Sequence, residues 1–384
     1  MAKIPFLARI VIAIALGIAL GFVMPGAVIR GFNTFNGIFN QLLGFLVPLI
    51  ILGFVTSAIA ELGRGAGKML ALTAAIAYCG TVVSGLLAYG CSTTLFPSFI
   101  GEVGTAGLSE SGTSFPPFFT IAIPPLMGVM TALVTSFLLG LGIAAFDART
   151  LQQVFFEFKD IVTLAISKVI LPLLPVYIFG LFLDMTAVGS IGRVMGSFLI
   201  IIAIIFAMTA VLLVLQYCVA GAVVHRNPFR LLARMMPAYF TALGTASSAA
   251  TIPVTLQQTI RNGVSPEVAG FTIPLCATIH MSGSMLKITS CAVALMLMQG
   301  IPFDFPLMLG FVMMLGITMV AAPGVPGGSI MAALGVLDGI LGFTSQQQAM
   351  MITLYIAMDS FGTACNVTGD GAIALIIDKI KNRR

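Results

Sequence analysis

Long apolar segments recur along this chain, and they restrict its fold more than any other feature. Apolar runs between polar breaks predict six spans before residue 225, at residues 10–29, 42–60, 69–96, 124–146, 161–183 and 194–224. A helix needs about 20 mainly apolar residues to cross the hydrocarbon core of a bilayer. Charged residues make up only 8% of the chain, whereas soluble domains carry about 25%. These features indicate a polytopic membrane protein.

The predicted spans are expected to be helical. A bilayer core contains no water, so each backbone amide must find its partner within a helix or a closed β-barrel. Long runs such as residues 197–224 lack the strict alternation of polar and apolar residues that barrel strands show. The predicted fold class is therefore an all-α polytopic membrane protein.

Basic residues lie singly at the ends of the predicted loops. Short loops that carry Lys and Arg stay on the cytoplasmic side. The segment 97–114 instead carries Glu102 and Glu110 and lacks Lys and Arg, so it is expected to lie outside. This pattern predicts a multi-pass protein of the plasma or inner membrane with both termini cytoplasmic. The partners expected are membrane lipid and a small-molecule substrate, and the scattered charge offers no patch for nucleic acid.

The six cysteines all fall within apolar segments, without a CxxC pair or the spacing of metal ligands. Neither a disulfide framework nor a zinc site is indicated. No resident cofactor is expected.

Two later apolar segments are interrupted by small residues and proline. Residues 244–253 have the sequence GTASSAATIP, and residues 321–329 have the sequence AAPGVPGGS. Gly and Pro would weaken a simple spanning helix at these points. Irregular backbone survives at membrane depth only where it lines a cavity, and paired interruptions are typical of transporter binding sites. We therefore expect two re-entrant helical hairpins whose tips enclose a site.

Four polar residues recur in the last apolar segment, at Asp359, Thr363, Asn366 and Asp370. Their spacing of four, three and four residues places them on one face of a helix. Ionisable groups within a membrane are costly and therefore indicate function. A cation and an amino group are the natural partners of the two acids. The alternative is structural, in which a buried carboxylate caps a neighbouring broken helix or pairs with Lys287.

A second polar cluster lies in residues 271–298 and comprises Thr278, His280, Ser282, Ser284 and Lys287. His280 is either a packing residue or a functional one. Lys287 lies seven residues further on, about two turns along the same face, and a buried ammonium needs an acid or carbonyl partner. One hypothesis makes Lys287 a tethered cation that replaces a transported ion, and the alternative is that it snorkels to the interface. A change of protonation at Lys287 or His280 would couple transport to protons.

Four motifs follow one another in the second part of the chain. They are residues 241–255 (TALGTASSAATIPVT), 278–284 (TIHMSGS), 324–328 (GVPGG) and 359–370 (DSFGTACNVTGD). In this order they resemble the dicarboxylate/amino acid:cation symporters, the glutamate-transporter superfamily, and the resemblance extends along essentially the whole chain. It implies eight transmembrane helices plus two re-entrant hairpins, a homotrimer, and an elevator mechanism in which a transport domain moves against a scaffold.

The resemblance also implies a division of the chain. Residues 1–225 would form six transmembrane helices that serve largely as scaffold and trimerisation surface, with helices 3 and 6 joining the transport domain. Residues 226–384 would form the core of the transport domain. Its expected parts are hairpin 1 at about 227–263, helix 7 at about 264–300, hairpin 2 at about 304–342 and helix 8 at about 344–378.

Carried over by position, the resemblance assigns two sets of site residues. The substrate site would comprise Ser247, Ser248, Ser284, Val325, Gly327, Asp359, Gly362, Thr363 and Asn366, with Asp359 holding the amino group of the substrate. Cation binding or coupling would involve Thr278, His280, Ser282, Lys287, Asn366 and Asp370. Asn366 and Asp370 would be the sodium ligands if sodium is the coupling ion. A second cation site would use carbonyls of Thr278 and of residues 319–322.

Two departures from the family pattern change the expected substrate and ion. Acidic-substrate members carry an arginine where this chain has Gly362, so a side-chain carboxylate would lack its bidentate partner. The usual motif Asn-Met-Asp-Gly-Thr is here residues 280–284, HMSGS, which removes a carboxylate and an amide from a further sodium site. We therefore predict a symporter that couples sodium or protons to a small neutral amino acid such as serine, threonine or alanine. The alternative is a carrier of dicarboxylates or other organic anions, with Lys287 or His280 as the positive partner.

Other classes of protein fit the sequence less well. A membrane-embedded hydrolase would use His280 as base and Ser282 or Ser284 as nucleophile. No GxSxG-type elbow surrounds these serines, and no acid in the same segment is placed to orient the histidine. A channel would need a continuous polar pore, whereas the polar groups cluster at mid-membrane. The chain is therefore predicted to be a transporter and not an enzyme.

Overall fold

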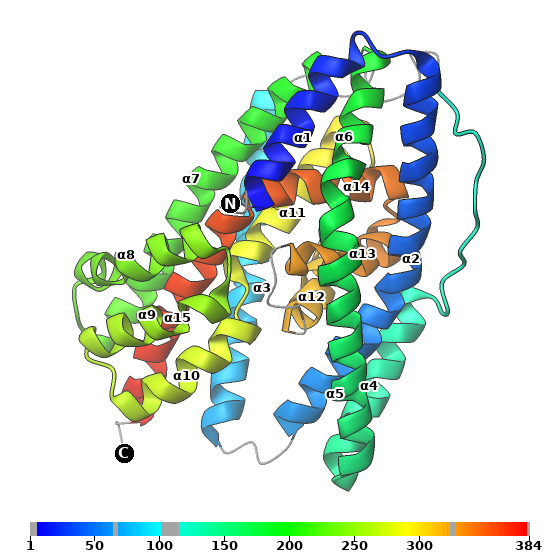
Figure 1. Cartoon of the computed structure of the whole chain (residues 1–384). Helices are drawn as coiled ribbons and strands as arrows, with labels where there is room; N and C mark the ends of the chain where they lie inside the picture. The colour runs from blue at the N-terminus through cyan, green and yellow to red at the C-terminus, as the bar shows by residue number, and fades with distance from the viewer. Residues whose placement is uncertain are drawn as a thin grey trace, which may run out of the picture.

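The computed structural model describes residues 6–63, 68–100, 115–189, 191–320, 322 and 327–381. Within these ranges every regular element is a helix (Figure 1). The first part of the chain forms α1 (Phe6–Gly21), α2 (Gly26–Gly63), α3 (Lys68–Ile100), α4 (Val129–Phe146), α5 (Arg149–Ala165), α6 (Leu171–Ala187) and α7 (Ile191–Val224). A π-helical segment, Ile166–Ile170, joins α5 to α6 without a break.

The second part of the chain consists of shorter helices. They are α8 (Pro228–Thr245), α9 (Ser248–Arg261), α10 (Pro266–Ile279), α11 (Ser282–Gln299), α12 (Phe305–Val320), α13 (Gly328–Leu341), α14 (Ser345–Ala357) and α15 (Asp359–Lys381). We call α8–α9 the first helix pair and α12–α13 the second, because the two members of each pack on one another. They occupy the ranges predicted for the two hairpins.

Six helical stretches in the described ranges are long and apolar enough to cross a membrane. They are Gly26–Ser57, Met69–Phe99, Arg149–Ala187, Phe198–Val224, Pro266–Gln299 and Asp359–Lys381. The shorter apolar helices are Ala8–Gly21, Val134–Phe146, Phe305–Val320 and Gly328–Leu341. These lengths and compositions support the predicted class, an all-α membrane protein.

The boundary predicted between the first two spans is wrong. The expected span 10–29 runs through the turn that separates α1 from α2, and α2 begins at Gly26 rather than near residue 42. Polar residues in the segment 30–41 indicated a break between two spans, but these side chains form hydrogen bonds with distant parts of the chain. Asn33 donates to Asp184 Oδ1 at 2.8 Å and Asn40 accepts from the hydroxyl of Tyr177 at 2.7 Å. A helix therefore continues through this segment, because its polar side chains bond to α6.

Two groups of helices are evident from the packing. In the first group, α2 packs against α4, α5 and α6, and α1 packs against α6. In the second group, α15 lies among α7, α8, α9, α10 and α11, while α3 packs against α11 and α12. Figure 1 shows α8, α9 and α10 on one side of the molecule and α2, α4 and α5 on the other. The groups meet where α13 contacts α2 and α4.

Candidate functional site

The first helix pair turns at Ala246 and Ser247. Ala246 adopts a left-handed conformation, with φ of 48°, and ends α8. The extended backbone of Ser247 then begins α9, and its hydroxyl accepts a hydrogen bond from the amide of Ala250 at 3.3 Å. Ser248 is the first residue of α9 and is buried. Ser247 is thus an N-cap, which leaves the start of α9 at the tip of the pair.

The tip of the second helix pair lies between α12 and α13. Gly327 ends it with φ of 74°, a left-handed conformation that favours glycine, and α13 begins at the next residue. Val325, predicted to bind substrate, lies outside the described residues, as does Ala321 of the predicted carbonyl set 319–322.

The break between α10 and α11 falls at His280 and Met281, and Asn366 of α15 closes it. The side-chain oxygen of Asn366 accepts hydrogen bonds from the amides of Gly283 at 2.7 Å and Ser284 at 3.3 Å. Its amide nitrogen donates to the hydroxyl of Ser284 at 3.1 Å. Asn366 therefore supplies the acceptor that the first turn of α11 lacks within its own helix.

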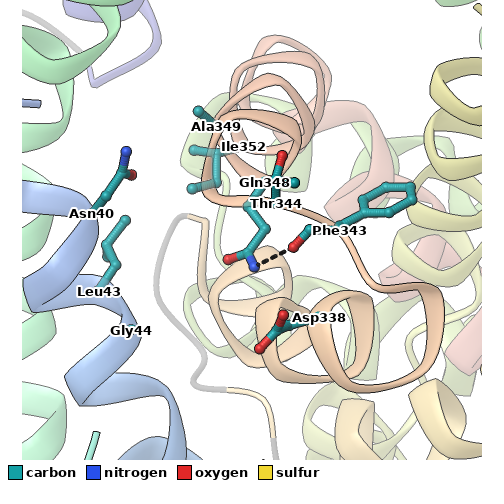
Figure 2. Close-up of a pocket in the computed structure, with 9 residues that line it drawn as sticks. All are labelled: Asn40, Leu43, Gly44, Asp338, Phe343, Thr344, Gln348, Ala349 and Ile352. Carbon is teal, nitrogen blue, oxygen red and sulfur yellow. Dashed lines mark hydrogen bonds between the residues drawn. The ribbon is translucent and has the colours of Figure 1, made fainter. Parts of the chain in front are cut away.

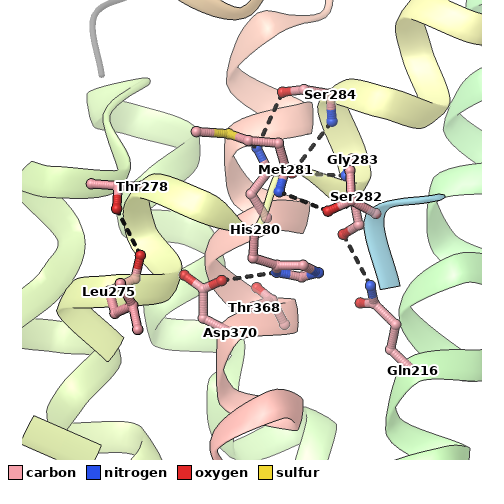
Figure 3. A network of polar contacts seen from close by, with 12 residues as sticks. Gln216, Leu275, Thr278, His280, Met281, Ser282, Gly283, Ser284, Thr368 and Asp370 are labelled. Carbon is pink, nitrogen blue, oxygen red and sulfur yellow. Dashed lines mark hydrogen bonds and ion pairs between the residues drawn. The ribbon is translucent and has the colours of Figure 1, made fainter. Parts of the chain in front are cut away.

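Asp370 lies one turn after Asn366 in α15 and pairs with His280 (Figure 3). The distance between His280 Nδ1 and Asp370 Oδ1 is 2.9 Å, and each side chain is 1% exposed. An acid therefore does orient the histidine, but it comes from α15 and not from the segment 271–298. Ser282 and Ser284, the predicted alternative nucleophiles, are engaged elsewhere: Ser282 accepts from Gln216 at 2.9 Å, and the hydroxyls of Ser284 and Tyr355 lie 3.0 Å apart.

Asp359 lies at the start of α15 and meets two other elements. Its Oδ2 accepts a hydrogen bond from the amide of Gly327 at 2.7 Å, and its Oδ1 lies 3.8 Å from Lys287 Nζ. Lys287 also donates to the carbonyl of Met358 at 3.1 Å, and its Nζ lies 3.9 Å from the centroid of the Tyr355 ring. The Lys287 side chain is 1% exposed. The alternative in which Lys287 snorkels to the surface is therefore wrong for this structure.

Glycines let the two basic side chains lie against α15. A Cβ at Gly362 would lie 2.2 Å from both Cε and Nζ of Lys287. A Cβ at Gly369 would lie 2.7 Å from Cε1 of His280. Lys287 follows His280 by seven residues while Gly362 precedes Gly369 by seven, as two antiparallel segments require. The side chains of His280 and Lys287 therefore each pass over a glycine of α15 and reach an acid of the same helix.

The polar face predicted on α15 is present and buried. Asp359, Thr363, Asn366 and Asp370 all have little exposure. The hydroxyl of Thr363 donates to the carbonyl of Asp359 at 3.1 Å, within the same helix. Thr278 differs from the rest of the predicted cluster, because its hydroxyl donates to the carbonyl of Leu275 and its side chain is exposed.

Several residues of this cluster were not predicted. Gln216 of α7 donates to Ser282, and its buried Oε1 has no hydrogen-bond partner. Ser84 of α3 donates to the carbonyl of Ser282 at 2.9 Å. A lone amide in the apolar run 194–224 was a signal for Gln216, whereas Ser84 resembles any small hydroxyl residue that packs between helices. In the described ranges, no group of three or more His, Cys, Asp and Glu side chains is placed to hold a metal ion.

A cavity lies away from this cluster, between α2 and the corner where α13 is followed by α14 (Figure 2). Its volume is about 330 Å³, and its lining comprises Asn40, Leu43, Gly44, Asp338, Phe343, Thr344, Gln348, Ala349 and Ile352. A smaller cavity of about 130 Å³ shares Gly44, Asp338 and Gln348 with it. The predicted site residues are absent from both linings, so these cavities belong to the contact between the two groups of helices.

The profile of the sodium:dicarboxylate symporter family matches residues 6–380. The chain belongs to this family. The predicted resemblance is confirmed. The sodium:dicarboxylate symporter family is a family of transporters.

Similar relatives include the serine/threonine transporter SstT of Acinetobacter baumannii strain AYE. It is 27% identical over 397 residues, which cover 100% of this chain and 98% of the relative. The protein of the same name from strain SDF is 26% identical over 397 residues, with the same coverage. The similarity to these members of the sodium:dicarboxylate symporter family therefore extends over the whole chain.

Proposed function

We propose that the protein is a secondary active symporter that couples a cation to the uptake of a small neutral amino acid such as serine, threonine or alanine. The observation that carries this proposal is the acid Asp359, buried beside the tip of the second helix pair, with glycine at position 362. An acid suits the ammonium of an amino acid. The absence of an arginine at 362 removes the anchor for a side-chain carboxylate. The names of the relatives from Acinetobacter baumannii agree with this substrate class.

The two helix pairs supply the rest of the substrate site in this proposal. Ser247 and Ser248 begin α9, whose N-terminus favours an anion such as the substrate carboxylate. Thr363, Ser284 and Gly327 contact the remaining part of the substrate. Val325 and Asn366 also contact the region of the substrate α-carboxylate, as the resemblance implies. The hydrogen bonds of Asn366 to α11 limit its freedom to contact a ligand.

The coupling ion in this proposal is sodium, which the family description names. Asp370 and Asn366 are its side-chain ligands, with carbonyls near Thr278 and His280. Because His280 already bonds to Asp370, the cation competes with an imidazole for this carboxylate. Protons are the alternative coupling ion.

The larger architecture proposed is that of an elevator. The eight transmembrane helices and two re-entrant hairpins form a homotrimer in the plasma or inner membrane, with both termini cytoplasmic. The group of α1, α2, α4, α5 and α6 serves as scaffold. The group of α3 and α7–α15 moves and carries the substrate, in agreement with the way that α15 lies among its neighbours.

Uptake into proteoliposomes tests the proposal. Purified protein is reconstituted, and labelled serine or succinate is supplied with an inward gradient of sodium or of protons. Serine uptake driven by sodium is expected, with succinate near background, and Asp359→Asn is expected to abolish it because the substrate ammonium loses its charged partner. Undiminished uptake by Asp359→Asn would remove this residue from the site.

A second candidate substrate class is the dicarboxylates. The observation that favours it is the ammonium of Lys287, which fills the space beside Gly362 where the family places an arginine. Sodium-driven succinate uptake that exceeds serine uptake in the same proteoliposomes would select this class.

A further inference from the structure

The contact between the two groups of helices contains two cavities that share an acid. The larger has a volume of about 330 Å³ and the smaller of about 130 Å³, and both are lined by Gly44, Asp338 and Gln348. Figure 2 shows Asp338 and Gln348 on one side of the larger cavity and Asn40 and Leu43 of α2 on the other. The carboxylate of Asp338 therefore lies where the two cavities meet.

Asp338 has no partner of its own within the part of the chain that the structure describes. Its side chain is exposed and makes neither a hydrogen bond nor an ion pair with the described residues. It lies in the last turn of α13, where the negative end of the helix dipole disfavours an acid and favours a cation. The place of Asp338 in the fold therefore favours a positively charged ligand.

The walls around Asp338 combine one further acceptor with many apolar groups. Gln348 donates its amide nitrogen to the carbonyl of Phe343 at 3.0 Å, which leaves its side-chain oxygen for a ligand. The apolar residues are Leu43, Phe343, Ala349 and Ile352 in the larger cavity and Val47, Pro48, Pro125, Met127 and Leu334 in the smaller. Binding sites for small molecules have this composition, with a few polar groups that orient an otherwise apolar ligand.

An anionic ligand does not fit these cavities. The start of α14 borders the larger one, but Thr344 accepts from the amide of Gln347, and the Gln347 side chain accepts from the amide of Thr344. The described residues of both linings include neither Lys, Arg nor His. The phosphate of a lipid headgroup would therefore meet Asp338 without a basic partner.

A metal ion fits poorly as well. In the described ranges, no three His, Cys, Asp or Glu side chains are grouped to hold one. Calcium and magnesium take about six or more oxygen ligands, and the apolar walls cannot supply them. An organic ammonium needs only the carboxylate of Asp338 and the side-chain oxygen of Gln348, and its apolar part suits the remaining walls.

We propose that the two cavities form a binding site for a free primary amine with an apolar group, such as an arylalkylamine, whose ammonium binds Asp338 and Gln348. Such a ligand contacts α2 of one group of helices and α13 and α14 of the other. It holds the two groups together and inhibits transport without competition with the amino acid. The inhibition rests on the proposed function, in which α13 moves along α2, whereas the binding does not.

Equilibrium dialysis of the purified protein against labelled phenethylamine tests the site. Saturable binding by wild type is expected, and Asp338→Asn is expected to raise the Kd by about tenfold or more, because the ammonium loses its charged partner. The control is Asp160→Asn, which changes an exposed acid of α5 and is expected to keep the wild-type Kd. Phenethyl alcohol lacks the charge and methylamine lacks the apolar group, so both are expected to displace the label much more weakly.

A second variant fills the site from the side of α2. A Cβ at Gly44 meets nothing within 4 Å, so Gly44→Leu is expected to fold and to occupy the space of the ligand. Its Kd for phenethylamine is expected to rise at least as much as that of Asp338→Asn. The matched control is Gly37→Leu, on the same helix and equally without neighbours within 4 Å. Equal binding by wild type, Asp338→Asn and Gly44→Leu would show partition into detergent only and overturns the site.

Sodium-driven serine uptake in proteoliposomes tests the inhibition. Phenethylamine is expected to lower the maximal rate and to leave the KM for serine unchanged, and Asp338→Asn is expected to need about tenfold more amine for the same effect. Unaffected uptake, or a raised KM with an unchanged maximal rate, overturns the inhibition. If wild type does not carry serine, the proposed function fails, and the dialysis still tests the site by itself.

Discussion

The effect of a substitution at position 362 depends on Lys287, which lies against Gly362. Gly362→Arg alone is expected to reduce serine uptake to background, because even the first carbon of the new side chain would meet Lys287 at 2.2 Å. When Lys287→Ala is added, the guanidinium has room, and uptake of aspartate is expected to appear since Arg binds a carboxylate bidentately.

The measurement is uptake of labelled serine and aspartate by both variants, with folding checked by size-exclusion chromatography. Aspartate uptake by the single variant would show that Lys287 does not occupy this space in the working protein.

His280 carries a prediction about sodium. The His280→Asn variant restores the asparagine of the usual family motif and removes the imidazole from Asp370. The half-saturating sodium concentration is expected to fall by about tenfold, because a hydrogen bond to a charged group contributes about 1.5 kcal/mol or more. Serine uptake is measured against sodium concentration for wild type and variant. An identical sodium dependence would mean that His280 does not compete with the cation.

The sequence predicted the acidic face of α15 but not what its residues contact. Spacing along one helix was sufficient to place Asp359 and Asp370 on the same face. Their partners lie far away in the chain, at Lys287 and His280 of the broken helix, and both alternatives for the acids remained open. Gln216 and Ser84 were missed because each belongs to a helix that otherwise shows an ordinary apolar pattern.

The broken helix α10–α11 depends on an acceptor from another element. Asn366→Ala leaves the amides of Gly283 and Ser284 without their partner, and each unsatisfied buried group costs about 1–3 kcal/mol. A clear fall in the melting temperature is expected in sodium-free buffer, where loss of a sodium ligand has no effect.

The control for this prediction is Asn227→Ala, which removes an exposed cap from the start of α8. Its loss is expected to be smaller, at about 1 kcal/mol. Equal melting temperatures for wild type and Asn366→Ala would contradict the capping role of Asn366.

Helix breaks were easier to predict than helix starts. Small residues and proline marked the tips of both helix pairs, because these residue types weaken a helix wherever they occur. The start of α2 was missed because its first turns carry polar residues such as Asn33 and Asn40. Only the folded protein brings Asp184 and Tyr177 to them, so no local pattern reveals that they are satisfied.

The contact between the two groups of helices gives a prediction for the whole molecule. Gly44 of α2 and Asp338 of α13 line the same cavity, and a Cβ at Gly44 meets nothing within 4 Å. In a variant without native cysteines, Gly44→Cys with Asp338→Cys is expected to be joined by a bifunctional thiol reagent. Uptake is then expected to stop, because the proposed elevator requires the group of α3 and α7–α15 to move along α2.

Each single cysteine variant treated with the same reagent serves as control, and a cleavable reagent is expected to give the uptake back after reduction. Continued uptake in the cross-linked protein would show that transport does not require movement at this contact.

The crossing of Lys287 over Gly362 also constrains how such a carrier evolves. A mutation that introduces a large side chain at 362 meets the lysine before it meets any substrate. A mutation that shortens Lys287 first leaves the buried acid of Asp359 without its counter-charge. A change from this pocket to one with an arginine at 362 therefore requires two substitutions, of which neither is neutral alone. A change of preference from neutral to acidic substrates then passes through a single variant of lower fitness. Proteins that carry only one of the two substitutions are therefore expected to be rare.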